Sequence, residues 1–212
     1  MAAKLEFEVP TGEGMLKVTE RDFPEIENVI VQGKEYARQN AGAENRKNQI
    51  FPRDLYQDPK VLDTALFKLA LDPQVIATAS AYLGFVPILA TANFWFNPND
   101  TITDGTQEGY DTSLYHLDWA DNALLKLFVH CSDITDTNGP LHLLSLDQSA
   151  KLRSALDYHY PQKRNASADI NATDGLYIDD ALVETHLGKG VQSTAVTGDD
   201  GTAYFAYTAS CF

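Results

Sequence analysis

Helical spacing of apolar positions dominates the first part of the chain. Residues 24–38 carry apolar side chains every three or four positions, and Asp22 stands where a helix cap is expected. Residues 58–71 and 72–83 repeat this pattern, each beginning with an Asp-Pro pair, and Gly84 follows as a C-terminal stop. The sequence therefore predicts three helices before residue 85.

Continuous or alternating apolar runs replace the helical spacing from residue 87 onward. This change of period predicts short strands separated by polar turns. Strands are expected at residues 88–96, 113–119, 124–131, 141–144, 191–196 and 202–208, with a short one earlier at 4–9 and a helix at 148–158. Polar loops are expected at residues 40–48, 101–112 and 162–180.

The order of these elements predicts an α+β fold with a mainly β core. We expect one domain over residues 1–212, with a helical lead-in over about residues 1–85 and the β core over about residues 86–212.

Charge and composition narrow the possible partners. The 212 residues include 16 Lys plus Arg and 30 Asp plus Glu, which gives a formal net charge of −14. Such a field repels phosphate groups, so neither nucleic acid nor a membrane is expected as a partner. The chain has only two cysteines, no run of about 18 apolar residues and no apolar signal-peptide core near its start. We therefore expect a cytoplasmic protein.

The strongest chemical signal is the segment Tyr115-His116-Leu117-Asp118-Trp119. Residues i and i+2 of a strand point to the same face, so the His116 imidazole and the Asp118 carboxylate are expected to converge. Together they supply two of the three ligands of the facial triad that binds non-heme Fe(II). The competing interpretation is a His–Asp pair on the surface of a purely structural domain.

Several short motifs surround this segment in a definite order. They are Leu71-Asp72-Pro73, Tyr82-Leu83-Gly84, the apolar run 125–134 and Asn138-Gly139-Pro140-Leu141, with a further match over residues 198–212. In order and spacing they resemble the phytanoyl-CoA dioxygenase family of Fe(II)/2-oxoglutarate-dependent oxygenases. The resemblance covers roughly residues 60–150 and 198–212.

This resemblance implies a double-stranded β-helix, a jelly-roll or cupin-like barrel with Fe(II) at its mouth. His116 and Asp118 match the first two metal ligands of the family. The implied activity is hydroxylation of a small-molecule substrate by O2, with decarboxylation of 2-oxoglutarate to succinate. Family members that halogenate replace the carboxylate ligand with a small residue, so Asp118 favours hydroxylation.

The sequence departs from the family pattern at its end. A segment like residues 201–212 leads, in the family, into a distal His as third ligand and then an Arg that binds 2-oxoglutarate, and neither can be assigned here. The chain looks cut just before the third ligand, so the last core strands are expected to be missing and residues 1–212 alone to be inactive or prone to aggregation. The remaining histidines are expected to be structural or exposed; they are His130, His142, His159 and His186.

Two further residues are candidates for binding 2-oxoglutarate. Asn97 ends the strand at 88–96, and Lys126 faces away from its apolar neighbours Leu125 and Leu127. The alternatives are that Asn97 only opens a turn and that Lys126 extends its ammonium to solvent. A non-catalytic cupin-like barrel that binds a small ligand or a metal is the main alternative function.

Overall fold

The computed structural model describes residues 14–40, 47–50, 59–95, 114–118, 123–158 and 178–209. The helices are α1 (Ile26–Asn40), η2 (Pro59–Asp63, a 3-10 helix), α2 (Ala65–Ala70), α3 (Pro73–Leu83), α4 (Leu146–Ala155) and α5 (Asp180–Leu187). The strands are β1 (Met15–Val18), β2 (Lys47–Ile50), β3 (Ala92–Trp95), β4 (Lys126–Val129), β5 (Leu141–Leu143), β6 (Thr194–Val196) and β7 (Ala203–Ala206). Every strand pair is antiparallel, which confirms the expected mixture of helix and sheet.

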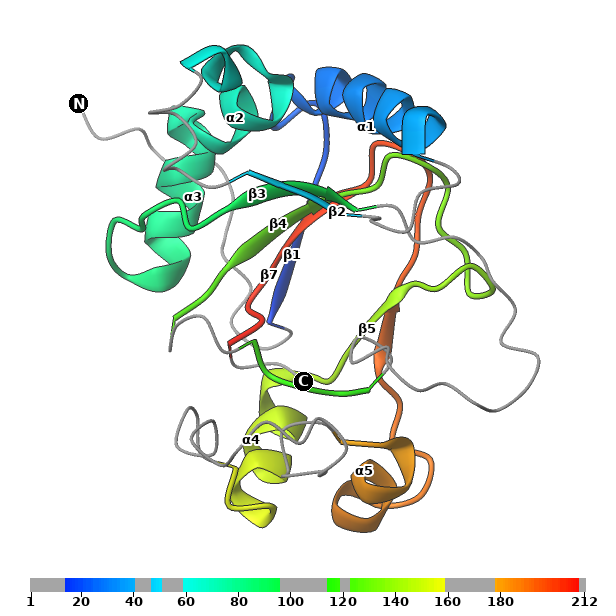
Figure 1. Cartoon of the computed structure of the whole chain (residues 1–212). Helices are drawn as coiled ribbons and strands as arrows, with labels where there is room; N and C mark the ends of the chain where they lie inside the picture. The colour runs from blue at the N-terminus through cyan, green and yellow to red at the C-terminus, as the bar shows by residue number, and fades with distance from the viewer. Residues whose placement is uncertain are drawn as a thin grey trace, which may run out of the picture.

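Strand β7 lies at the centre of the largest sheet. It pairs with β1 on one side and with β4 on the other, so that Tyr204 is opposite both Lys17 and Phe128. All four residues of β7 are buried. Helices α1, α2 and α3 lie on one side of this sheet, whereas α4 and α5 lie at the opposite end of the molecule (Figure 1).

The two faces of β7 contribute to different apolar clusters. Ala203 and Phe205 pack with the inner faces of α1, α2 and α3. Tyr204 and Ala206 point the other way and pack with Val196 of β6 and its neighbours on β5. This alternation is what a strand buried on both faces requires, because successive side chains point to opposite sides.

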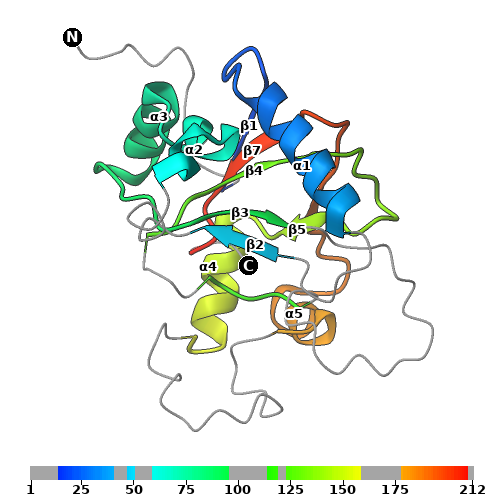
Figure 2. The same cartoon turned by 45° about the horizontal axis from the view of Figure 1, so that its top comes forward.

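Strands β4 to β7 form one long antiparallel ribbon. The register of β4 against β7 continues through a bridge between Ile134 and Gly198 and ends in the pairing of β5 with β6. Between Ile134 and Leu141 the chain makes an extra polar loop. In it the Thr135 amide donates to Asn138 Oδ1, and Asn138 Nδ2 donates to the Asp133 carbonyl. Through this bend the ribbon passes from the large sheet to the β5–β6 sheet (Figure 2).

The described strands form one three-stranded and two two-stranded sheets and do not close into a barrel. The closed jelly roll implied by the resemblance is therefore not seen in the described ranges. The expected late strands are present, but β6 and β7 do not pair with each other across the turn at Gly198-Asp199-Asp200-Gly201. Each pairs instead with an earlier strand, because the ribbon brings β5 and β4 alongside them.

Two expected helix boundaries are confirmed and two are wrong. Helix α3 begins after the cap Asp72 and ends at Gly84, which has a left-handed φ of 80°. The helix expected at 58–71 is instead divided into η2 and α2, because the Thr64 side chain caps a new helix at Phe67 N. Asp22 does not cap α1; its carboxylate accepts bonds from the amide and hydroxyl groups of Thr19 in the preceding turn.

Three elements lie where none was expected. Strand β1 adds to the large sheet, β2 includes residues that were expected to be a polar loop, and α5 follows the expected loop 162–180. Helix α4 also begins earlier than expected, at a reciprocal cap between Ser145 and Gln148. The strand expected at 4–9 lies outside the described residues.

The packing of α1 against the end of β4 depends on Gly33. A Cβ at this position would lie 2.4 Å from the Cys131 sulfur and 2.9 Å from the Cys131 Cβ.

No helix in the described ranges is long and apolar enough to cross a membrane.

Gly33→Ala is expected to lower the free energy of unfolding by about 1–3 kcal/mol, because α1 must move away from Cys131. Val31→Ala on the exposed face of the same helix should change it by less than about 0.5 kcal/mol. Urea denaturation of both variants tests the contact. An increase in stability for Gly33→Ala, which alanine gives in an unconstrained helix, would contradict this packing.

Candidate functional site

The segment that carries the predicted iron ligands is fixed by backbone hydrogen bonds. Tyr115 exchanges two bonds with Ile178, with N···O distances of 2.9 and 2.8 Å. Three residues later, Asp118 N donates to the Thr208 carbonyl at 2.9 Å. Between these ties Leu117 is 2% exposed and packs in the cluster formed with α4 and α5.

His116 and Asp118 flank this buried leucine and are both half-buried. A strand was expected at 113–119, but in the described part, residues 114–118, only an isolated bridge at Tyr115 is formed.

A short hydrogen bond orients the His116 ring. Its Nδ1 lies 2.8 Å from the carbonyl oxygen of Leu114. Since a carbonyl only accepts, Nδ1 donates the proton of this bond. A backbone carbonyl on the second ring nitrogen is the usual support of a histidine that ligates a metal.

Asp118 forms an ion pair with Lys126, the first residue of β4. The Lys126 Nζ lies 2.5 Å from Asp118 Oδ2, and the two side chains are 41% and 22% exposed. Leu127, the next residue, packs on the opposite side under the helices, as the sequence predicted for alternation at this strand. The structure thus brings together two of the residues that sequence analysis selected.

Thr208 is a polar residue of this region that sequence analysis did not select. It is 7% exposed, its carbonyl accepts the bond from Asp118, and its hydroxyl has no hydrogen-bond partner among the described residues. A buried hydroxyl without a partner is costly and marks a place where a further polar group fits. Its position two residues beyond β7 gave no motif by which the sequence alone could have identified it.

The other predicted residues do not join this region. Asn97, Trp119 and His159 lie outside the described residues. His142 is exposed and contacts Ser193, and His186 is exposed on α5. Across the ranges that the structure describes, no three His, Cys, Asp or Glu side chains gather to hold a metal ion.

His130 is buried at the far end of β4 and is 8% exposed. Burial lowers its pKa, an effect that the nearby Lys17 charge increases and a backbone bond at Gly198 opposes. Burial in an apolar setting disfavours the imidazolium, so the ring is held in its neutral form. This agrees with the sequence-based expectation of a structural histidine.

Cys131 is unsuited to nucleophilic chemistry. Burial raises its pKa from 9.0 to about 11, with Lys34 opposing and Asp200 adding to the change. The thiolate, which is the reactive form, is therefore scarce at neutral pH. The thiol also packs against Gly33, so its role is to fill space between α1 and the sheet.

The rate of alkylation tests the predicted low reactivity of the Cys131 thiol. In a Cys211→Ser background, the native Cys131 thiol should react with iodoacetamide at pH 8 about a hundredfold more slowly than the same thiol in urea, since its pKa is about two units higher. Equal rates in the two states would contradict the burial of this side chain.

Comparisons with known proteins add no family to this geometry. No protein-family model, curated protein or solved structure matches the chain.

Proposed function

We propose that the chain is an Fe(II)- and 2-oxoglutarate-dependent dioxygenase, similar to the phytanoyl-CoA dioxygenases, that hydroxylates a small-molecule substrate. The observation that carries the proposal is the arrangement around Leu117. An oriented imidazole and a carboxylate flank this buried residue, and a lysine on the adjacent strand is paired with the carboxylate.

The course of the β4–β7 ribbon supports a jelly-roll core. A jelly roll forms when an antiparallel ribbon bends so that its two halves contribute to two facing sheets. Here β4 and β7 contribute to one sheet and β5 and β6 to another, and the cluster with Tyr204 and Val196 fills the space between them. Completion into a closed barrel remains part of the proposal.

The described residues supply two of the three protein ligands that a ferrous ion needs in a facial set. His116 Nε2 and an oxygen of Asp118 would hold the metal, as two members of a His-His-carboxylate facial set. A third protein ligand is not assigned among the described residues. When bound, iron together with 2-oxoglutarate and O2 would supply the oxidising power for an unactivated C–H bond, which no side chain can supply.

Lys126 and Thr208 then have defined tasks. In the metal-free protein the Lys126 ammonium neutralises Asp118. With a metal ion held by that carboxylate, the ammonium would be available to a carboxylate of 2-oxoglutarate. The Thr208 carbonyl holds the Asp118 amide, and the Thr208 hydroxyl, which has no partner among the described residues, could donate to 2-oxoglutarate or to substrate. Asn97 stays a proposed second contact to 2-oxoglutarate.

A non-catalytic barrel is the second candidate, and one observation favours it. The described residues provide two candidate ligands and not three, which suits weak metal or ligand binding better than sustained turnover.

Anaerobic titration with Fe(II) and 2-oxoglutarate tests the site. We expect a visible charge-transfer band in residues 1–212 that is lost in His116→Ala and Asp118→Ala, because each removes a ligand. His186→Ala and Asp136→Ala remove exposed side chains of the same types and should leave the band unchanged.

The outcomes separate the candidates. An unchanged band in His116→Ala or Asp118→Ala would overturn the site. A band without iron-dependent succinate formation in air would favour the non-catalytic barrel, and succinate formation would favour the oxygenase.

Lys126→Met separates the two tasks of this lysine. Binding of Fe(II) alone should be as tight as in the parent or tighter, because the cation competing for Asp118 is gone. The apparent affinity for 2-oxoglutarate should fall about tenfold or more, because a charged hydrogen bond to a carboxylate is lost. Titration of the charge-transfer band with each component measures both. A parallel loss of both affinities would contradict the assignment of Lys126 to 2-oxoglutarate.

A further inference from the structure

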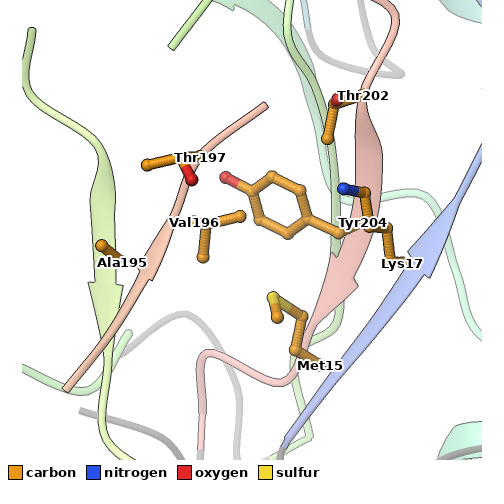
Figure 3. A pocket seen from close by; sticks show the side chains of 7 residues that line it. All are labelled: Met15, Lys17, Ala195, Val196, Thr197, Thr202 and Tyr204. Atoms are coloured by element: carbon orange, nitrogen blue, oxygen red, sulfur yellow. The ribbon is translucent and has the colours of Figure 1, made fainter. Parts of the chain in front are cut away.

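A mainly apolar cavity lies between the β1–β7–β4 sheet and the β5–β6 sheet, beside β1 and β6. Its volume is about 120 Å³. Met15, Ala195 and Val196 form its apolar wall. Its polar lining residues are Lys17, Thr197, Thr202 and Tyr204. Figure 3 shows the Tyr204 ring reaching from β7 toward β6, with its hydroxyl directed to Thr197.

Strand pairing places the charged group beside the phenol. Lys17 of β1 is directly opposite Tyr204 of β7, so both side chains leave the sheet on the same face. Met15 projects from the same face of β1 into this space (Figure 3). Leu16 and Val18 point to the other face and pack under the helices. Lys17 is thus the charged residue of β1 on this face, and it is exposed at the edge of the space between the sheets.

These polar groups are available to a ligand. Within the described ranges, no hydrogen bond or ion pair engages the Lys17 ammonium or the hydroxyls of Thr197, Thr202 and Tyr204. The Tyr204 residue is 2% exposed, and burial raises its pKa, so the phenol stays protonated and is a hydrogen-bond donor.

A buried histidine extends the polar character behind Tyr204. The rings of His130 and Tyr204 meet edge to face with centroids 5.4 Å apart. His130 Nδ1 is buried and has no hydrogen-bond partner in the part of the chain that the structure describes, and the ring lies within the field of Lys17. The Tyr204 ring also stacks on Phe128, with the ring centroids 5.1 Å apart, and this contact holds the phenol in place.

This cavity is separate from the His116 and Asp118 region. Thr202 precedes β7, whereas the Thr208 carbonyl that holds Asp118 follows it. Six residues of extended chain span about 20 Å. One ligand molecule of a few atoms cannot reach both.

We propose that this cavity binds a small monocarboxylate, with its carboxylate between Lys17 and the three hydroxyls and its short aliphatic chain against Met15 and Val196. A single ammonium balances one negative charge, whereas a phosphate dianion would keep an uncompensated charge in a protein whose net charge is −14. The apolar wall adds a contact that an inorganic anion cannot use.

Titration of the metal-free chain with sodium butyrate, followed by protein NMR, tests the proposal. Butyrate is expected to bind with a Kd on the order of millimolar, as suits a ligand of so few atoms. Butyramide, of the same shape but without charge, should bind at least about tenfold more weakly. Inorganic phosphate at the same ionic strength should compete poorly. Tighter binding of phosphate than of butyrate would overturn the ligand class.

Variants locate the binding. Lys17→Met should weaken butyrate binding about tenfold or more, and Tyr204→Phe should weaken it severalfold. Lys151→Met, which removes an exposed lysine of α4, should leave it unchanged. Lys17 is exposed, so its variant is expected to fold, and a thermal melt checks this.

An unchanged Kd in Lys17→Met would overturn the proposal. An equal loss of butyrate affinity in Lys151→Met would overturn it too, because it would show that any lysine on the surface attracts the anion. Lys126→Met should not alter the butyrate affinity, so this result is independent of the proposed iron site. A loss in Lys126→Met instead of Lys17→Met would place the carboxylate at the other end of β7 and overturn the second site.

Discussion

The pairing of β7 on both sides is the constraint on which the rest of the structure depends. Its four residues are buried on both faces, and they hold β1 and β4 in one sheet. One face of β7 anchors three helices through Phe205, and the other anchors the β5–β6 sheet through Tyr204. A buried strand of this kind fixes its register strongly, because a slip of one residue would exchange the two faces.

This constraint also sets the two polar regions at opposite ends of one strand. The chain enters β7 at Thr202, beside the cavity with Lys17, and leaves it at Thr208, beside Asp118. The ion pair of Asp118 with Lys126 joins the His116 segment to β4 and thereby to the same sheet. Both regions therefore rest on a rigid strand, which suits sites that need fixed geometry.

Local signals in the sequence were sufficient for much of this fold. The Asp72 cap and Gly84 defined α3, and the alternation around Lys126 placed that side chain on the face opposite Leu127. The short strand β1 could not be predicted in this way, because its burial depends on Tyr204 and Phe205, nearly two hundred positions later. The cavity depends on the same distant pairing. Lys17 and Thr197 are far apart in the sequence and form no motif, and they come together only because β1 and the β4–β7 ribbon pack in one fold.

The late partner of β1 also has a consequence for biosynthesis. Met15–Val18 leaves the ribosome early, but its partner Ala203–Ala206 is made about 190 residues later. At ordinary rates of translation this interval is on the order of ten seconds or more. During that time the apolar face of β1, with Leu16 and Val18, has no sheet to join. The nascent chain therefore exposes an apolar segment, to which a chaperone can bind until β7 is made.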